Sequence, residues 1–273
     1  MKIVVWSMTP FSGRKSTNLL LLALQSVMKE GGEQVVIHAD GSGSGPEHFL
    51  LSGSHRSRMM KQKEFGVEFL CKWLHCQKVT KEMIKNASYT FAEGRLHILP
   101  SGKEGFYKRN EAEAIKEVCA MMQIADTMFQ NVWVELPAGE SAYSQQILAN
   151  ADYVIVNLSQ SPCEITKLES LSKLPHTFFV IGAYEQCNIY TLHNLEKLFP
   201  ELKGRCGVIP YHRGLFSACC AGYAEQFFLR GIIPGERKCS SFFRKVENAY
   251  EIWKEGREVL CEEKEKERET AGI

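Results

Sequence analysis

The chain has 273 residues, of which 44% are hydrophobic, so it can bury the core of one large domain or of two small ones. Its 33 basic residues nearly balance its 32 acidic ones, and this balance gives no indication of a nucleic-acid partner. The sequence has no run of about 18 apolar residues, which excludes a transmembrane helix. The N-terminal MKIVVW is expected to be a first strand rather than a signal peptide, because its apolar part is short and no cleavage region follows.

The most informative segment lies between the first strand and the first helix. An apolar strand at Ile3–Trp6 leads into a loop that ends in Arg14-Lys15-Ser16-Thr17, and an apolar helix follows at Leu19–Met28. This layout is typical of a phosphate-binding loop, in which backbone N–H groups and a helix N-terminus face an anion while a lysine and a hydroxyl complete the cradle. The alternative is a strand-to-helix turn without a ligand.

The loop departs from the pattern GxxxxGK[ST] and can be aligned to it in two registers. If Lys15 is the phosphate lysine and Ser16 the magnesium ligand, then Thr9 and Arg14 replace the two glycines. If Gly13 is the last glycine instead, Arg14 replaces the lysine, and its planar guanidinium is not equivalent to an ammonium. The sequence leaves both registers open.

Apolar runs alternate with helical patterns along the rest of the chain. Further strands are expected at Gln34–His38, Leu96–Leu99, Val132–Leu136, Tyr153–Leu158, Thr177–Ile181 and Gly207–Ile209, and helices at 110–129, 141–150, 163–173, 191–199 and 214–230. Strands that are apolar throughout indicate a parallel sheet covered on both faces. The sequence therefore predicts a three-layer, doubly wound α/β fold with a mostly parallel sheet. The Gly/Ser-rich residues 41–63 are expected to form a flexible surface insertion.

Two acidic residues follow predicted strands. Asp40 follows the second strand, and Glu135 stands at the end of the strand Val132–Leu136. Ligands of such sheets bind at the carboxyl edge, and an acidic group there is suited to a magnesium–phosphate site. Each acid taken alone is more typical of a cap on the following helix. Their combination with the loop favours a functional site.

The C-terminal segment Cys239–Lys264 has apolar residues at helical spacing and is predicted to form an amphipathic helix. Its polar face carries many glutamates, so packing on the domain is favoured over a membrane surface. We therefore expect a main domain at 1–235, followed at 236–273 by this helix and a solvated charged tail (262–273). The ten cysteines include no C-x-x-C pair, and Cys71 and His75 lack a second ligand pair, which favours reduced thiols over a metal site.

Several motifs in order give the chain a family resemblance over about residues 1–235. They are WS-x-x-P-x-SGRKSTNLLLLAL, HAD, VELPAG, ANADYVIVNLSQ, FFVIGAYEQCNIYTLHNLEKLF and GVIPYHRGLFSAC. In this order they resemble the ParA/MinD family of P-loop ATPases. More narrowly, they are similar to the divergent branch related to TadZ and CpaE proteins, which is found with Tad-type pilus and secretion genes.

The resemblance implies roles for individual residues, with ATP and Mg²⁺ as cofactors. Lys15 or Arg14 would bind phosphate and Ser16 would bind magnesium, within a nucleotide-binding loop that also includes Ser12, Gly13 and Thr17. Asp40 falls where the family has a water-activating aspartate, and Glu135 falls where it has the switch II aspartate, so these two are the expected catalytic residues. The family's second lysine near the start of the loop is absent, since Thr9 and Pro10 occupy its two possible positions.

These departures predict weak, altered or lost hydrolysis. The expected function is a homodimeric ParA-like nucleotide-binding protein that positions or assembles a Tad-type pilus or secretion apparatus and contacts its proteins. The alternatives are a non-hydrolysing dimeric scaffold and a plasmid or chromosome partitioning ATPase. The expected location is the cytoplasm, with a peripheral position at the inner face of the membrane as a variant.

Overall fold

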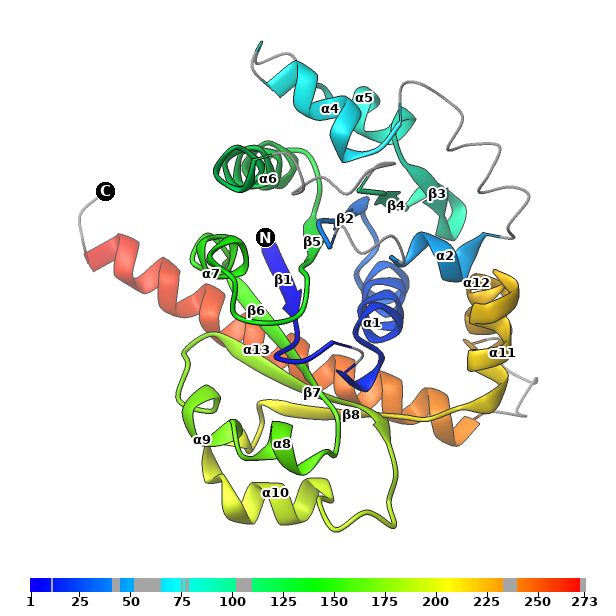
Figure 1. The fold of residues 1–273 in the computed structure, drawn as a ribbon, viewed down its shortest axis with the longest axis vertical. Helices are drawn as coiled ribbons and strands as arrows, with labels where there is room; N and C mark the ends of the chain where they lie inside the picture. Colours follow the sequence, from blue (N-terminus) through cyan, green and yellow to red (C-terminus); the bar gives the residue numbers. More distant parts are fainter. Residues whose placement is uncertain are drawn as a thin grey trace.

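The computed structural model describes residues 1–10, 12–40, 45–51, 65–74, 76, 79–101, 110–232 and 240–270. One sheet with the strand order β3-β4-β2-β5-β1-β6-β7-β8 forms the centre of the molecule (Figure 1). The strands are β1 (Lys2–Trp6), β2 (Gln34–His38), β3 (Tyr89–Phe91), β4 (Leu96–Leu99), β5 (Asn131–Glu135), β6 (Tyr153–Leu158), β7 (Thr177–Tyr184) and β8 (Cys206–Pro210). Every neighbouring pair is parallel except β3 and β4.

Helices cover both faces of the sheet, which makes the three layers that the sequence predicts. One face packs against α1 (Lys15–Glu30), α2 (Glu47–Leu50), α11 (Arg213–Ala221), α12 (Ala224–Ile232) and α13 (Ser240–Thr270). The other face packs against α4 (Val67–Leu74), α5 (Lys81–Asn86), α6 (Glu111–Asp126), α7 (Ala142–Leu148), α8 (Pro162–Ile165), α9 (Leu168–Leu171) and α10 (Leu192–Leu198). The inner strands β4, β2, β5, β1, β6 and β7 are buried on both sides almost throughout, which explains why apolar residues dominate them.

Several expected boundaries were wrong. The helix expected at 214–230 is two helices, because Gly222 adopts a left-handed conformation (φ 76°) and ends α11. The helix expected at 163–173 is likewise divided into α8 and α9, and the first helix begins at Lys15 rather than at Leu19. Of the insertion expected at 41–63, residues 45–51 contain α2, whose Leu50 is buried in the core, and the other residues lie outside the described chain.

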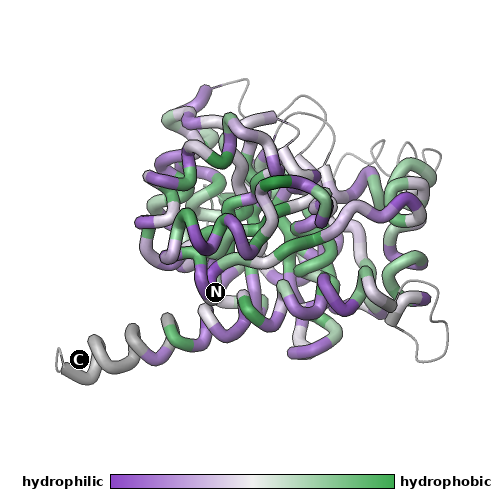
Figure 2. The backbone as a smooth tube through the Cα atoms, turned by 90° about the horizontal axis from the view of Figure 1, so that it is seen from below, coloured by the Kyte–Doolittle hydropathy of each residue, from purple (hydrophilic) through white to green (hydrophobic). Residues whose placement is uncertain are grey.

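The C-terminal helix α13 packs on the sheet, as its amphipathic pattern predicts. Trp253 is fully buried, and its ring centroid lies 5.1 Å from that of Trp133 on β5. A Cβ atom on Gly207 of β8 would lie only 2.7 Å from the Cβ of Ala249, so α13 approaches β8 closely. Figure 2 shows this helix running along one side of the molecule. The helix continues to Thr270, so most of the expected tail is helical.

Within the described residues, we find no helix with both the length and the apolar character needed to cross a membrane.

Candidate functional site at the carboxyl edge of the sheet

The predicted loop lies at the carboxyl end of β1, near the middle of the sheet, and leads through a short 3-10 turn (Ser12–Arg14) into α1. Phe11 is outside the described residues. The loop lies directly on the ends of β6 and β7. A Cβ atom on Gly13 would overlap the Leu158 carbonyl oxygen, and one on Gly182 would overlap the Gly13 carbonyl oxygen. Both positions therefore require glycine, and Gly13 also has a positive φ of 45°.

Two asparagine side chains hold the loop backbone in this position. The amide of Asn18 donates to the carbonyl oxygen of Gly13 at 2.7 Å and to the side-chain oxygen of Asn157 at 2.6 Å. Asn157, at the end of β6, donates in turn to the carbonyl oxygen of Ser12 at 2.7 Å. Both asparagines are buried, so these bonds satisfy carbonyl groups that water cannot reach.

Glu164 in α8 fixes the first half of the loop. Its carboxylate accepts hydrogen bonds from the hydroxyl groups of Thr9 and Ser12, the latter at 2.6 Å, and from the backbone N–H of Ser159 at 2.6 Å. Glu164 is only 3% exposed, so these donors are what stabilises its buried carboxylate. Thr9 is one of the two positions at which the family resemblance expects a lysine, and here it makes a local contact instead.

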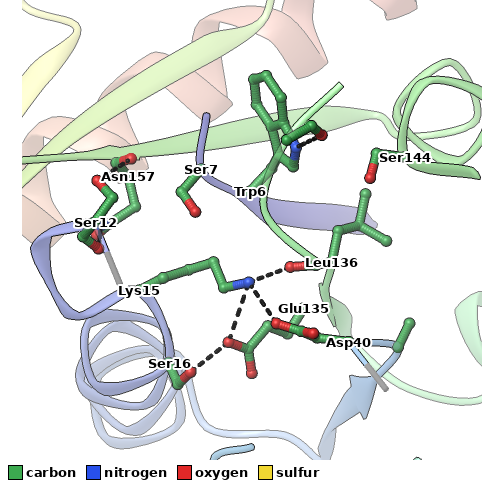
Figure 3. Close-up of polar contacts among 12 residues, drawn as sticks. Trp6, Ser7, Ser12, Lys15, Ser16, Asp40, Glu135, Leu136, Ser144 and Asn157 are labelled. Carbon is green, nitrogen blue, oxygen red and sulfur yellow. Dashed lines mark hydrogen bonds and ion pairs between the residues drawn. The ribbon is translucent and has the colours of Figure 1, made fainter. Parts of the chain in front are cut away.

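Lys15, Ser16, Asp40 and Glu135 converge on the other side of the loop (Figure 3). The Lys15 ammonium donates to Asp40 at 2.9 Å and to the Leu136 carbonyl oxygen, and it lies 3.6 Å from a Glu135 oxygen. The Ser16 hydroxyl donates to the same Glu135 oxygen. The sequence therefore identified four side chains that the fold brings into one cluster from α1, the end of β2 and the end of β5.

The side chains of Arg14, Lys15 and Ser16 point in two directions. Lys15 and Ser16 point at the acids (Figure 3). Arg14 has a left-handed backbone conformation, with φ 61°, and its guanidinium carbon lies 4.6 Å from the ring centroid of Phe216 in α11. Arg14 thus has the backbone conformation that suits a glycine, as expected if it stands at the last glycine position. Thr17 is buried but faces the opposite side, in a small cavity with Cys219.

Two titratable groups at this edge of the sheet, Glu135 and His38, have shifted pKa values. Burial raises the pKa of Glu135, although Lys15, His38 and the Ser16 hydroxyl favour its charged form. His38 is the register neighbour of Glu135 on β2 and pairs with Glu47 at 3.1 Å. Burial alone would lower the pKa of His38, but the charge of Glu47, its hydrogen bond and the more distant Glu135 and Asp40 together raise it.

Sequence reasoning missed Glu164, Asn18 and the His38–Glu47 pair as parts of the site. The only available signal for His38 was its position beside Asp40 at a strand end. Nothing in the sequence shows that Glu164, about 150 residues away, would contact Thr9 and Ser12, because that contact depends on the order of the strands.

The donor set fits a magnesium–phosphate group. Mg²⁺ prefers oxygen ligands and is commonly held by one or two carboxylates together with substrate phosphates. Ser16, Asp40 and Glu135 supply such oxygens, and Glu135 Oε2 is buried without a hydrogen-bond partner among the described residues. The N-terminus of α1 has no side-chain cap and no acidic residue in its first turn, which suits an anion. Within the described residues, no group of three or more His, Cys, Asp or Glu side chains could hold a metal, either at this site or elsewhere.

Comparison with known proteins supports the fold rather than a close relationship. No protein-family model and no curated protein matches the chain. The similar solved structures include a ParA family ATPase from Chlorobium tepidum TLS, with a TM-score of 0.67 and 12% identity over 91% of this chain and 98% of that chain. The MinC:MinD cell division protein complex of Aquifex aeolicus has a TM-score of 0.61 and 15% identity, covering 92% and 94% of the two chains. A structure described as a plasmid partition protein from Borrelia burgdorferi bound to AMPPNP has a TM-score of 0.58 and 15% identity, covering 93% and 98%.

The chain therefore has the fold of the ParA and MinD ATPases along nearly its whole length, which confirms the predicted fold class.

Proposed function

We propose that this chain is a ParA/MinD-type nucleotide-binding protein that takes ATP and Mg²⁺ at the loop Ser12–Thr17. The observation that carries the proposal is the convergence of Lys15, Ser16, Asp40 and Glu135 at the N-terminus of α1. A strand-to-helix turn without a ligand would not need to bury a lysine against two carboxylates, since an apolar contact would be at least as stable.

The residues have distinct roles in this proposal. Lys15 and the first N–H groups of α1 bind phosphate oxygens, and the Ser16 hydroxyl is a magnesium ligand. Asp40 and Glu135 would accept hydrogen bonds from water beside the metal and the phosphates. Bound magnesium would supply positive charge that neutralises the phosphates. Arg14, Gly13 and Ser12 shape the loop, and Thr17 anchors α1 beneath it.

Hydrolysis is slow or absent in this proposal. A charge donor aimed at the developing charge of the transition state is typically worth about a hundred- to a thousandfold in rate. At the start of this loop, Thr9 supplies no cation, and its hydroxyl instead donates a hydrogen bond to the Glu164 carboxylate. A turnover equal to that of ordinary ParA proteins, and lost in Lys15→Ala, would contradict this part of the proposal.

The biological role is proposed at two levels. The protein is a symmetric dimer that brings its loop edges together, in line with the commonest oligomer geometry. The sequence resemblance to the TadZ/CpaE branch favours a role in positioning a Tad-type pilus or secretion apparatus. The fold similarity to a plasmid partition protein supports partitioning equally well. A measurement of nucleotide-dependent binding to non-specific duplex DNA separates the partitioning role from the pilus or secretion role. Partitioning requires such DNA binding, so its absence would exclude that role.

Binding of a fluorescent ATP analogue, with and without magnesium, tests the proposal. Lys15→Ala should weaken binding by about tenfold or more, since a charged hydrogen bond is lost. Ser16→Ala should abolish only the magnesium dependence. Lys29→Ala is the matched control, because Lys29 lies on the same helix and its side chain pairs with Glu247 and Glu251 at the surface. Failure of the folded wild-type protein to bind the analogue would refute the proposal. Light scattering in the same conditions reports the dimer, and a monomer throughout would refute that part.

A further inference from the structure

The side chain of Arg14 lies in an aromatic corner beside the loop. Its guanidinium carbon is 4.9 Å from the ring centroid of Tyr211 and 4.6 Å from that of Phe216. The two ring centroids are 6.5 Å apart and the ring planes are inclined by 47° to each other, so the rings are tilted rather than stacked in parallel. Tyr211 is 43% exposed and Phe216 is 42% exposed, so both rings can be reached from solvent.

Arg14 separates two cavities at this edge of the sheet. A remnant of only about 10 Å³ remains between Arg14, Asn18, Tyr211 and Phe216. On the other side, an open groove of about 390 Å³ extends over Gly13, Ser159, Gly182 and Asn188 and also has Arg14 in its lining. The guanidinium therefore fills the aromatic side of the site, while the space beside it stays open.

Nothing else in the described chain explains an arginine here. The φ of Arg14 is 61°, a backbone conformation that disfavours any residue with a Cβ. Arg14 caps α1 without a side-chain hydrogen bond, and among the described residues it forms no salt bridge. The two rings hold the guanidinium by contacts that a flat, electron-poor group could also make.

We propose that Arg14 is an internal competitor for this corner. Its planar guanidinium occupies the place that a purine ring of the nucleotide would take between Tyr211 and Phe216, and it must swing out before the ring can stack. Arg14 thereby lowers the affinity for the base end of the nucleotide without touching its phosphate end. This inference rests on the proposed function, because it assumes that the phosphates bind at α1.

Competition has a defined thermodynamic signature. When the binding-competent conformation is only a fraction of the population, the apparent dissociation constant is the intrinsic one divided by that fraction. Two cation–π contacts with half-exposed rings leave about one tenth of the molecules with the corner open. Removal of the side chain should then tighten ATP binding about tenfold, the equivalent of about 1.4 kcal/mol.

The test compares ATP with inorganic tripolyphosphate by titration calorimetry in the presence of magnesium. Arg14→Gly is the main variant, since glycine accepts the positive φ and should fold. Arg14→Ala keeps the Cβ and therefore separates loss of the guanidinium from increased loop flexibility. Arg213→Ala removes the same charge from an exposed residue at the start of α11 and serves as the control.

Both Arg14 variants should bind ATP about tenfold more tightly than the wild type, with tripolyphosphate affinity changed less than twofold. Tyr211→Ala in the Arg14→Gly background should remove most of the gain. Weaker binding of both ligands in the Arg14 variants would overturn the inference and show that Arg14 binds phosphate. An equal gain for both ligands would also overturn it, because loop flexibility would then be the cause. Failure of all forms to bind tripolyphosphate would instead refute the proposed phosphate site.

Discussion

Replacement of Lys15 by methionine should lower the free energy of unfolding, because it leaves the buried acids of the site without their cation. Methionine preserves most of the volume and the apolar stem of Lys15 but removes the ammonium that lies between Asp40 and Glu135. Breaking a buried ion pair by removing one partner typically costs about 3–5 kcal/mol, because the other charge remains buried. Asp40 is 15% exposed and can be solvated in part, whereas the Glu135 side chain is 1% exposed and bears most of the cost.

The cost should depend on pH with a definite sign. The pKa of Glu135 is already raised by burial above the ordinary value of 4.5, and the loss of Lys15 should raise it further. Between the unfolded and the folded pKa, the native state keeps a proton that the unfolded state releases, so stability falls as pH rises. We expect a loss of about 3 kcal/mol near pH 8, where the carboxyl group left without its lysine would be charged, and a clearly smaller loss near pH 5.

Urea denaturation at the two pH values measures both losses. Lys29→Met is the control, and it should cost less than about 1 kcal/mol at either pH because its ion pairs are exposed. The double variant Lys15→Met/Glu135→Gln should recover at least half of the loss at the higher pH. A Lys15→Met protein as stable as the wild type near pH 8, or a loss that is the same at both pH values, would refute the reasoning.

Three further predictions concern the supports of the site. Glu164→Gln should lower the free energy of unfolding, measured in urea, by about 1–3 kcal/mol, because an amide N–H would face a hydrogen-bond donor of the loop. The control Glu169→Gln, at an exposed residue, should change the free energy of unfolding little. Equal effects of the two substitutions would show that the Glu164 carboxylate is dispensable. The pKa of His38 is raised to about 9, so an NMR titration should find this side chain still protonated well above pH 6.5. Its contribution to stability should be complete below pH 6.5 and should be lost as pH rises through about 9. In Glu47→Gln this loss should begin at lower pH, and an unchanged titration of His38 would contradict its pairing with Glu47. Trp253→Ala should cost about 3–5 kcal/mol by thermal or urea unfolding, and a small loss would mean that α13 is not part of the core.

Periodicity in the sequence sufficed for the parallel part of the sheet, because those strands are apolar on both faces. The strand β3 was missed because it has only three residues, Tyr89–Phe91, and pairs antiparallel at the edge of the sheet. The break between α11 and α12 could have been predicted, since Gly222 is a usual helix-ending residue. By contrast, α2 lies in a Gly/Ser-rich stretch, where composition favours a loop.

For the candidate site, the sequence predicted that Asp40 and Glu135 would lie at the loop, but not how they are paired or which further residues support the loop. The rule that ligands lie at the carboxyl edge of a parallel sheet is enough to bring Asp40 and Glu135 to the loop. Which side chain of the loop faces those acids depends on how α1 begins. Only the coordinates show that this side chain is Lys15. The partner of Arg14 is also hidden in the sequence, because Tyr211 and Phe216 follow β8, which lies far from β1 in the strand order.

The geometry of the loop explains why position 13 is a glycine while position 14, where the pattern aligned on Lys15 has a glycine, can be an arginine. At Gly13 any side chain would overlap the end of β6, and the neighbouring strand β7 also has glycine at its contact with the loop. At Arg14 the Cβ points out of the loop toward α11, so a side chain costs only the positive φ. A glycine of this loop can therefore be replaced only where the new side chain does not overlap neighbouring atoms. Here the new side chain lies in the aromatic corner, so the same residue that departs from the glycine pattern also controls access to the site.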